Sequence, residues 1–195
     1  FKASWATLNG FAQNEKLLGA QSGMVAVLHT WGQNLSLHPH LHCIVPAGGL
    51  TNSGRWKSTK SKGKFLFPVK QMSKVYRAKF MAELRKHLDV PYGISQKVFS
   101  KPWVIYAKRP FYGPKQVIEY LGRYTHKIAI SNHRLVRYEN NQISFTAKNY
   151  KKGGVKELLT LNDKEFIRRF ALHILPKGYT RLRHFGILSS AYKLK

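Results

Sequence analysis

The sequence predicts an α+β domain in which helices pack on an antiparallel β-sheet. Two short runs rich in apolar and β-branched residues, Met24–Trp31 and Leu37–Val45, follow each other across a short turn and predict neighbouring strands. A longer segment, Pro68–Leu88, carries apolar residues at three- and four-residue spacing, which is the period of an amphipathic helix. Strand and helix patterns then continue to the end of the chain without a repeat of domain size. This order of elements is typical of an α+β domain.

In the first half of the chain, glycines and prolines separate the expected elements. Residues 1–23 are polar and mixed, and we expect a short helix or loops there. The strand Met24–Trp31, the turn Gly32–Asn34 and the strand Leu37–Val45 form a plausible antiparallel pair. The stretch Thr51–Lys64 is rich in Ser, Gly and Lys, which predicts a loop that could touch a phosphate backbone.

The second half contains helices with recognisable starts. Pro114 occupies a first helical position, where its missing N–H costs nothing. Asn162, followed by Glu165, predicts another helix start. The expected elements are, in order, a connector at Asp89–Pro102, a strand at Trp103–Ala107, a helix from Pro114 to about His126, a hairpin of Leu135–Tyr138 and Gln142–Ala147, a strand at Val155–Leu161 and a helix that starts at Asn162 and ends before Pro176.

The charge balance points to a polyanionic partner. The chain of 195 residues has 34 Lys and Arg against 8 Asp and Glu, a net charge of +26, while its hydrophobic fraction of 43% is sufficient for a folded core. Such an excess indicates nucleic-acid binding. A membrane surface is the rival partner, but no apolar run is long enough to span a bilayer, and the basic residues are spread along the chain. The single cysteine, Cys43, excludes an internal disulfide and fits a cytoplasmic setting.

Three histidines alternate within the second strand, at His38, His40 and His42. Because side chains of a strand alternate between its two faces, all three are expected on one face. Imidazole is the commonest protein ligand for a catalytic divalent metal. The pattern therefore predicts a metal site, although a partly buried strand that happens to carry histidines is the plainer reading.

A second stretch, Tyr120–Lys127, places two phenols beside two cations. Tyr120 and Tyr124 are four residues apart and share one face of a helix, and each precedes a cation by three residues, Arg123 and Lys127 respectively. A nearby cation favours the phenolate and attracts a phosphodiester. An activated tyrosine can act as a covalent nucleophile, whereas the plainer reading is an aromatic stripe in the core.

These residues resemble a known family. His40-Leu41-His42 resembles the His-hydrophobic-His motif of the HUH single-strand DNA endonucleases, and Tyr120–Lys127 resembles their two-tyrosine motif. The likeness is closest to the rolling-circle transposases of the IS-ninety-one type and extends from about Met24 to Gly186. Such transposases usually carry an N-terminal zinc-binding segment, which this sequence with its one cysteine does not contain. Further matching stretches are Trp31–Asn34, Tyr106–Lys108, Ser131–Arg134, Leu175–Gly178 and Arg183–Gly186.

The resemblance implies a fold and a reaction. The fold has the His-x-His strand in the middle of a central antiparallel sheet and the tyrosines on a helix. His40 and His42 would hold Mg²⁺ or Mn²⁺, and Tyr120 and Tyr124 would be the catalytic nucleophiles, so that one attacks single-stranded DNA to give a 5′-phosphotyrosine and a free 3′-OH before strand transfer. We expect Gln33 as the third metal ligand, with His29 and His126 as alternatives and His38 as a weaker one.

The remaining expectations concern DNA and domain organisation. The phosphate contacts expected are Arg123, Lys127, Lys115 and Arg134. Residues 1–23 are expected to form an N-terminal extension, and residues 24–195 the catalytic domain. The competing functional hypothesis is a non-catalytic basic domain that binds single-stranded DNA or RNA, in which the histidines are structural.

Overall fold

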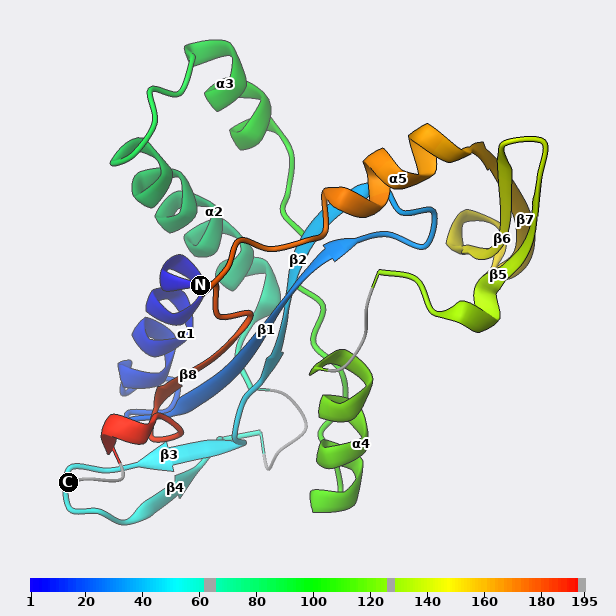
Figure 1. Ribbon diagram of the computed structural model, residues 1–195. Coiled ribbons are helices and arrows are strands. Elements are labelled where there is room, and N and C mark those ends of the chain that lie inside the picture. Colours follow the sequence, from blue (N-terminus) through cyan, green and yellow to red (C-terminus); the bar gives the residue numbers. More distant parts are fainter. Residues whose placement is uncertain (62–65, 126–128, 193–195) are drawn as a thin grey trace. The chain divides into compact units, whose positions relative to one another are not determined.

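The computed structural model describes residues 1–61, 66–125 and 129–192 (Figure 1). The chain has mixed α and β structure with antiparallel sheets, as the sequence predicts. It divides into two compact units, each of which is discontinuous in sequence. Unit 1 consists of Phe1–Ala26, Cys43–Pro114 and Arg183–Lys195, and unit 2 consists of Val27–His42 and Lys115–Leu182.

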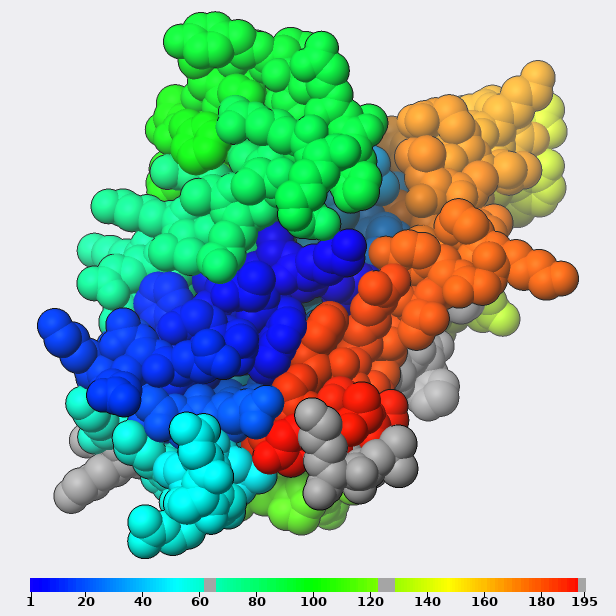
Figure 2. Space-filling view, turned by 90° about the vertical axis from the view of Figure 1, so that its left-hand side faces the viewer, coloured from blue at the N-terminus to red at the C-terminus, as the bar shows by residue number. Residues whose placement is uncertain are grey.

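Unit 1 is built on two long helices that lie side by side, α1 (Lys2–Gln13) and α2 (Val69–Arg85) (Figures 1 and 2). Helix α1 buries Ala3, Thr7, Leu8 and Ala12, of which Leu8 and Ala12 are one turn apart on the same face. Leu8 and Ala12 belong to a core that also includes the following residues: Leu18, Ala20, Met24, Ala26 and Phe67. The segment before residue 24 is therefore a packed helix followed by a turn.

Three smaller elements, β3 (Gly48–Leu50), β4 (Trp56–Ser58) and α3 (Tyr92–Ser100), also lie in unit 1. Strand β3 pairs antiparallel with β4, and α3 follows α2. Two predictions were wrong here: Thr51–Lys64 is not all loop, because it contains β4, and Asp89–Pro102 is not a plain connector, because it contains α3.

Unit 2 contains a three-stranded antiparallel sheet that is covered by a helix. Strand β5 (Leu135–Glu139) pairs with β6 (Gln142–Asn149), which pairs with β7 (Val155–Asn162), and α5 (Asp163–Ala171) packs on β6 and β7. The predicted hairpin is confirmed, and its turn holds Asn140 and Asn141 at φ of 48° and 58°. Asparagine tolerates this left-handed region better than most residues. The hydrophobic core of unit 2 contains the following buried residues: Leu35, Ala129, Ile130, Phe145 and Ala147.

Helix α4 (Pro114–Thr125) begins at the predicted proline, and α5 begins at the predicted cap, where the Asn162 side chain accepts from the Lys164 N–H at 3.0 Å. Short 3₁₀ turns lie at Asn132–Arg134, Tyr150–Lys152 and Ser190–Tyr192. None of the helices in the described ranges is long and apolar enough to cross a bilayer.

The histidine strand lies at the edge of its sheet. Strands β2 (Leu37–Ile44), β1 (Gly23–Trp31) and β8 (Leu182–Gly186) form one sheet in the order β2-β1-β8, so β1 is central and β2 has a single neighbour among the described residues. The expectation that this strand lies in the middle was wrong. The predicted strand Trp103–Ala107 was also wrong, since that segment has no regular structure. Its first residue is held by α2, where the Ser73 hydroxyl donates to the Trp103 carbonyl.

Candidate functional site

The candidate site is built on the alternation of strand β2. His38, His40 and His42 occupy every second position, and the imidazole rings of His40 and His42 have centroids 4.9 Å apart. Their Nε2 atoms approach to 3.1 Å. Two nitrogens at about 2.1 Å from one ion and about 95° apart would have this separation. The pair therefore has the spacing of two neighbouring ligands of one metal ion.

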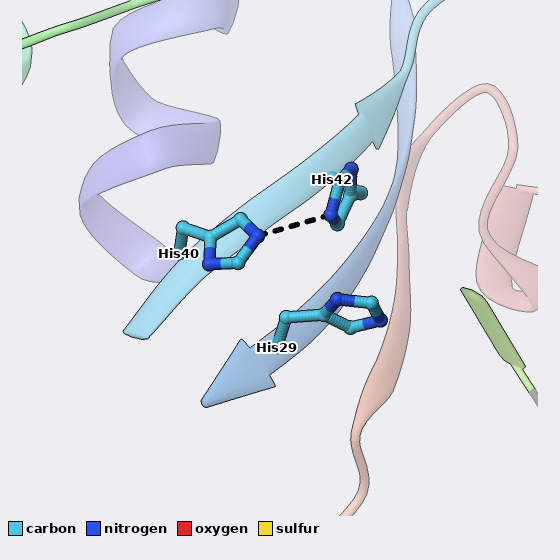
Figure 3. Close-up of side chains that lie close together, drawn as sticks. All are labelled: His29, His40 and His42. Carbon is cyan, nitrogen blue, oxygen red and sulfur yellow. Dashed lines mark hydrogen bonds between the residues drawn. The ribbon is translucent and has the colours of Figure 1, made fainter. Parts of the chain in front are cut away.

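A third histidine joins this pair from the neighbouring strand β1. Figure 3 shows the ring of His29 below the rings of His40 and His42, with the three side chains gathered on one side of the two strands. One potential ligand atom from each of the three residues lies within 4.8 Å of the others. His29 is buried, at 5% exposure, whereas His40 and His42 are half-buried. The cluster is thus closed on the side of β1.

Hydrogen bonds orient the two β2 rings. The Nδ1 atom of His40 lies 2.7 Å from the His38 carbonyl oxygen, which can only accept, so Nδ1 carries the proton and Nε2 presents its lone pair. A ligand histidine commonly donates its other N–H to a carbonyl in this way. His38 therefore contributes its backbone to the site, and its own ring is exposed.

Tyr120 of α4 lies next to the cluster. Its phenolic oxygen is 3.0 Å from Nδ1 of His42, although the two residues are 78 positions apart in sequence. The ring centroids are 6.1 Å apart and nearly perpendicular, at 69°. Both residues belong to unit 2. The structure therefore brings the first tyrosine of the pair within hydrogen-bond distance of one of the predicted metal-ligand histidines.

The other members of the tyrosine stretch are only partly described. Tyr124 and Arg123 fall on α4, one turn or less beyond Tyr120, and their side chains lie outside the described part of the structure. His126 and Lys127 lie outside the described residues altogether. Lys115, in the first turn of α4, is exposed.

The turn between β1 and β2 is held through three successive carbonyl groups. The Arg134 guanidinium donates to the Gln33 carbonyl, and the Arg169 guanidinium donates to the Asn34 carbonyl at 3.2 Å. His173 Nε2 lies 3.1 Å from the Leu35 carbonyl oxygen. Leu35 itself is fully buried and has a φ of 60°. Because this turn sets which residues of β1 and β2 face each other, the three donors fix the placement of the histidines.

Gln33 and Arg134 therefore have structural partners. The Gln33 side-chain oxygen accepts from the Lys148 backbone N–H at 3.5 Å, so its amide is directed to β6. Arg134 also donates to the Thr146 carbonyl at 2.8 Å and lies over the Phe145 ring. Partial burial lowers the pKa of the Arg134 guanidinium from its usual value, but a guanidinium remains charged at neutral pH. Both residues act in unit 2 as links between the β1–β2 turn and β6.

An aromatic stack supports the buried histidine. The Trp31 ring lies 4.5 Å from the His29 ring at an interplanar angle of 25°. The Arg181 guanidinium lies over the Trp31 ring, 5.5 Å from its centroid. His173 packs edge-on against Trp31, with centroids 6.0 Å apart, while its Nδ1 faces the Thr30 hydroxyl at 3.1 Å. These contacts limit the orientations open to the His29 ring.

Sequence reasoning singled out His40, His42 and Tyr120, and it named His29 only as an alternative. The signal for His29 was its place in a strand next to the histidine strand. Whether it shares the face of His40 depends on the register of the two strands, and a shift of one residue reverses that face. Trp31 was noted only as part of a stretch that resembles the family, and the roles of His173 and Arg181 depend on contacts between distant segments.

Fold and site together define a class: a mixed α+β protein of high positive charge with a three-histidine cluster and an adjacent tyrosine. Residues 23–195 match the model of the family Y2_Tnp, which bears the description "Putative transposase". This match covers most of the chain, and the chain belongs to this transposase family.

Two curated relatives agree with the family. The chain is 42% identical over 214 aligned residues to "Putative transposase y4qJ" of Sinorhizobium fredii, an alignment that covers 99% of this chain and 52% of the relative. It is 27% identical over 188 residues to the "Transposase for insertion sequence element IS801" of Pseudomonas savastanoi pv. phaseolicola, covering 90% of this chain and 45% of that protein. The chain thus spans about half the length of these relatives. No solved structure gives a significant match.

Proposed function

We propose that this chain is the catalytic part of a transposase of the HUH single-strand DNA endonuclease type, which acts in rolling-circle transposition. In this function it nicks single-stranded DNA through a 5′-phosphotyrosine intermediate and then transfers the strand. The observation that carries the proposal is the hydrogen-bond distance of 3.0 Å between Tyr120 Oη and His42 Nδ1, since it joins the candidate nucleophile to the candidate metal ligands. The family and the net charge of +26 support DNA as the substrate.

The proposed metal ligands are His29, His40 and His42. His29 takes the third place in preference to Gln33, because it lies in the cluster while the Gln33 amide faces Lys148. A divalent ion bound there supplies Lewis-acid stabilisation and orientation of the scissile phosphate. Of the two expected ions, Mg²⁺ prefers oxygen ligands and Mn²⁺ accepts imidazole more readily, so this set of nitrogen ligands favours Mn²⁺.

The tyrosine supplies the nucleophile. When Nε2 of His42 acts as a ligand, the neutral ring carries its proton on Nδ1, which donates to the Tyr120 oxygen and holds it beside the phosphate site. The Tyr120 Oη–phosphorus bond forms as the bond from phosphorus to the 3′-oxygen breaks. The phenol loses a proton and the leaving 3′-oxygen gains one, so the bond energy is retained in the phosphotyrosine and strand transfer needs no other source.

Tyr124 is proposed as the second nucleophile, because its position one helical turn after Tyr120 places it on the same face of α4. A second tyrosine would allow another cleavage while the first DNA end stays covalently attached. The proposed phosphate contacts beside the pair are Lys115, Arg123 and Lys127. Arg134, also expected there, has its guanidinium bound to two backbone carbonyl groups, and we assign it to positioning of the turn.

The test is formation of a covalent protein–DNA adduct. Labelled single-stranded oligonucleotides that cover both ends of the element are incubated with the protein and Mn²⁺, and adducts are detected on denaturing gels. We expect an adduct of the wild type with at least one oligonucleotide, a strong loss in Tyr120→Phe, and complete loss in the variant that combines Tyr120→Phe with Tyr124→Phe. The matched control is Tyr138→Phe, an exposed tyrosine of β5, which should leave the adduct unchanged.

Two results would contradict the proposal. One is an adduct that persists in the double tyrosine variant. The other is an adduct that forms equally well with a chelator present. A wild type that binds single-stranded DNA but gives no adduct with any oligonucleotide would favour the competing function, a non-catalytic DNA-binding or RNA-binding domain.

A further inference from the structure

A hollow of about 390 Å³ lies between helix α2 and the irregular segment that follows α3. Residues 69–77 of α2 line one side of it, and residues 102–105 line the other. All of these residues belong to unit 1, whereas the histidine cluster and Tyr120 belong to unit 2. The hollow therefore shares no residue with the site described above, and its volume lies in the range of about 300–1,000 Å³ that small-molecule sites occupy.

The helical side of the hollow is cationic. Lys70, Lys74 and Arg77 follow each other at spacings of four and three residues, which places them along one face of α2. Lys70 and Lys74 are exposed. No acidic residue lines the hollow within the described part of the chain. A polyanion is the complementary partner for such a row.

The opposite side of the hollow, residues 102–105, is apolar and is held to α2 by contacts of Trp103. Trp103 packs edge-on against Tyr76 and lies 5.1 Å from the Phe80 ring, and its carbonyl accepts from the Ser73 hydroxyl. Arg77 Nη1 donates to the carbonyls of Phe99 at 3.0 Å and Lys101 at 2.5 Å. Val104, next to Trp103, is nonetheless 91% exposed. The Val104 side chain is therefore accessible to a ligand that enters the hollow.

We propose that this hollow is a binding site for one unstacked nucleotide of single-stranded DNA, with the base against Pro102–Ile105 and the adjoining phosphates along Lys70 and Lys74. A nucleotide combines a base with apolar faces and a charged phosphate, and the two sides of the hollow match these parts. A base in a duplex is stacked on both faces and paired along one edge, so it cannot enter. The choice of single-stranded DNA as the ligand rests on the proposed function. The site adds a DNA contact that takes no part in the nicking reaction.

The first test measures binding without chemistry. Fluorescence anisotropy of labelled oligo(dT) is recorded in EDTA at several salt concentrations, for the wild type and for the variant with Lys70→Gln and Lys74→Gln. Loss of two phosphate contacts should reduce the slope of log K against log salt by about 1.4, since each contact on a single strand contributes about 0.7. The matched control, Lys79→Gln with Lys97→Gln, removes the same charge from exposed positions outside the hollow and should change the slope by less than half as much. Equal changes in the two variants would overturn the proposal.

The second test locates the base. An oligo(dT) that contains 5-iodouracil is cross-linked by light, and the attached peptide is identified by mass spectrometry. A cross-link within residues 102–105 supports the site, and cross-links found only elsewhere overturn it. Both measurements use no metal and do not require a tyrosine adduct, so their outcome is independent of the adduct test. If the wild type gives no adduct but the hollow binds oligo(dT), the nuclease proposal fails and the binding site stands.

Discussion

At the scale of single residues, His29 and Gln33 are the two candidates for the third ligand of the proposed metal site. Three neutral imidazoles leave the full charge of a bound divalent ion uncompensated, which strengthens its attraction for a phosphate oxygen. Gln33 would add an oxygen donor, but its side chain is already bonded to β6. His29 is buried behind the pair and stacked on Trp31, so it is preorganised for binding.

We predict that His29→Ala weakens Mn²⁺ binding by roughly tenfold or more, the scale on which even outer-shell partners affect metal sites. Gln33→Ala is the matched comparison and should leave the affinity within about twofold. Free Mn²⁺ is measured by electron paramagnetic resonance during titration of each variant. The reverse pattern, with weak binding only in Gln33→Ala, would restore the glutamine as the ligand.

A second residue-scale prediction concerns the β1–β2 turn. Arg134→Met keeps a long apolar side chain over Phe145 but removes the donors to the Gln33 and Thr146 carbonyls. Leaving a buried acceptor without a donor costs about 1–3 kcal/mol, and less where the acceptor is partly buried, as both of these carbonyls are. We expect a lower urea midpoint of unfolding, measured by circular dichroism. Stability equal to that of the wild type would contradict the structural role and return Arg134 to the set of DNA contacts.

At the scale of elements, patterns within one segment were the most predictive. The helices α2, α4 and α5 and the β5–β6 hairpin follow from periodicity, caps and an Asn-Asn turn, all of which act over a few residues. Trp103–Ala107 has a strand-like composition, but Trp103 packs on α2 and the segment forms no ladder. The edge position of β2 and the short strand β8 depend on pairing between distant segments, which local composition does not encode.

In the candidate site, too, local patterns were predictive and contacts between distant segments were not. The alternation of His40 and His42 and the helical spacing of the tyrosines could be predicted from the residue pattern, whereas the expectation that strand and helix meet came from the resemblance to a known family. The inclusion of His29 could not, because it requires the strand register. The positioning contacts of Trp31 and His173 link residues more than a hundred positions apart.

Helix α5 allows a prediction of pH dependence. Glu165 accepts from Arg168 Nε at 2.6 Å and Arg169 Nε at 2.7 Å, and these bonds hold its pKa at about 2, below the usual value of 4.5. Between these values the unfolded chain binds a proton that the folded chain does not, so the stabilisation is complete above about pH 4.5 and is lost as pH falls towards 2. Glu165→Gln should therefore lower the urea midpoint at pH 7 and have a diminishing effect down to pH 2.

The matched control for this prediction is Glu139→Gln. Glu139 is exposed and lies 3.5 Å from Arg137, so its ion pair is worth little in water. Its substitution should change the midpoint only slightly at any pH. A difference between wild type and Glu165→Gln that stays constant from pH 7 to pH 2 would show that the carboxylate bonds are not its cause.

At the scale of the whole molecule, we expect DNA binding and DNA cleavage to depend on different residues. With 34 basic residues against 8 acidic ones, most of the affinity for DNA is expected to come from phosphate contacts. We predict that the combined variant His40→Ala and His42→Ala forms no adduct but binds oligo(dT) with an affinity and a salt slope close to those of the wild type. A severe loss of binding, measured by anisotropy, would indicate that the two histidines are structural.

The membership of the histidine cluster and Tyr120 in one compact unit has a consequence for the order of events. These residues come from separate segments of the chain, yet all of them belong to unit 2. A DNA end attached to Tyr120 would accordingly remain tethered beside the histidines through the whole cycle. If the proposed function holds, the second phosphate would have to be brought by the DNA to the same cluster that holds the first end.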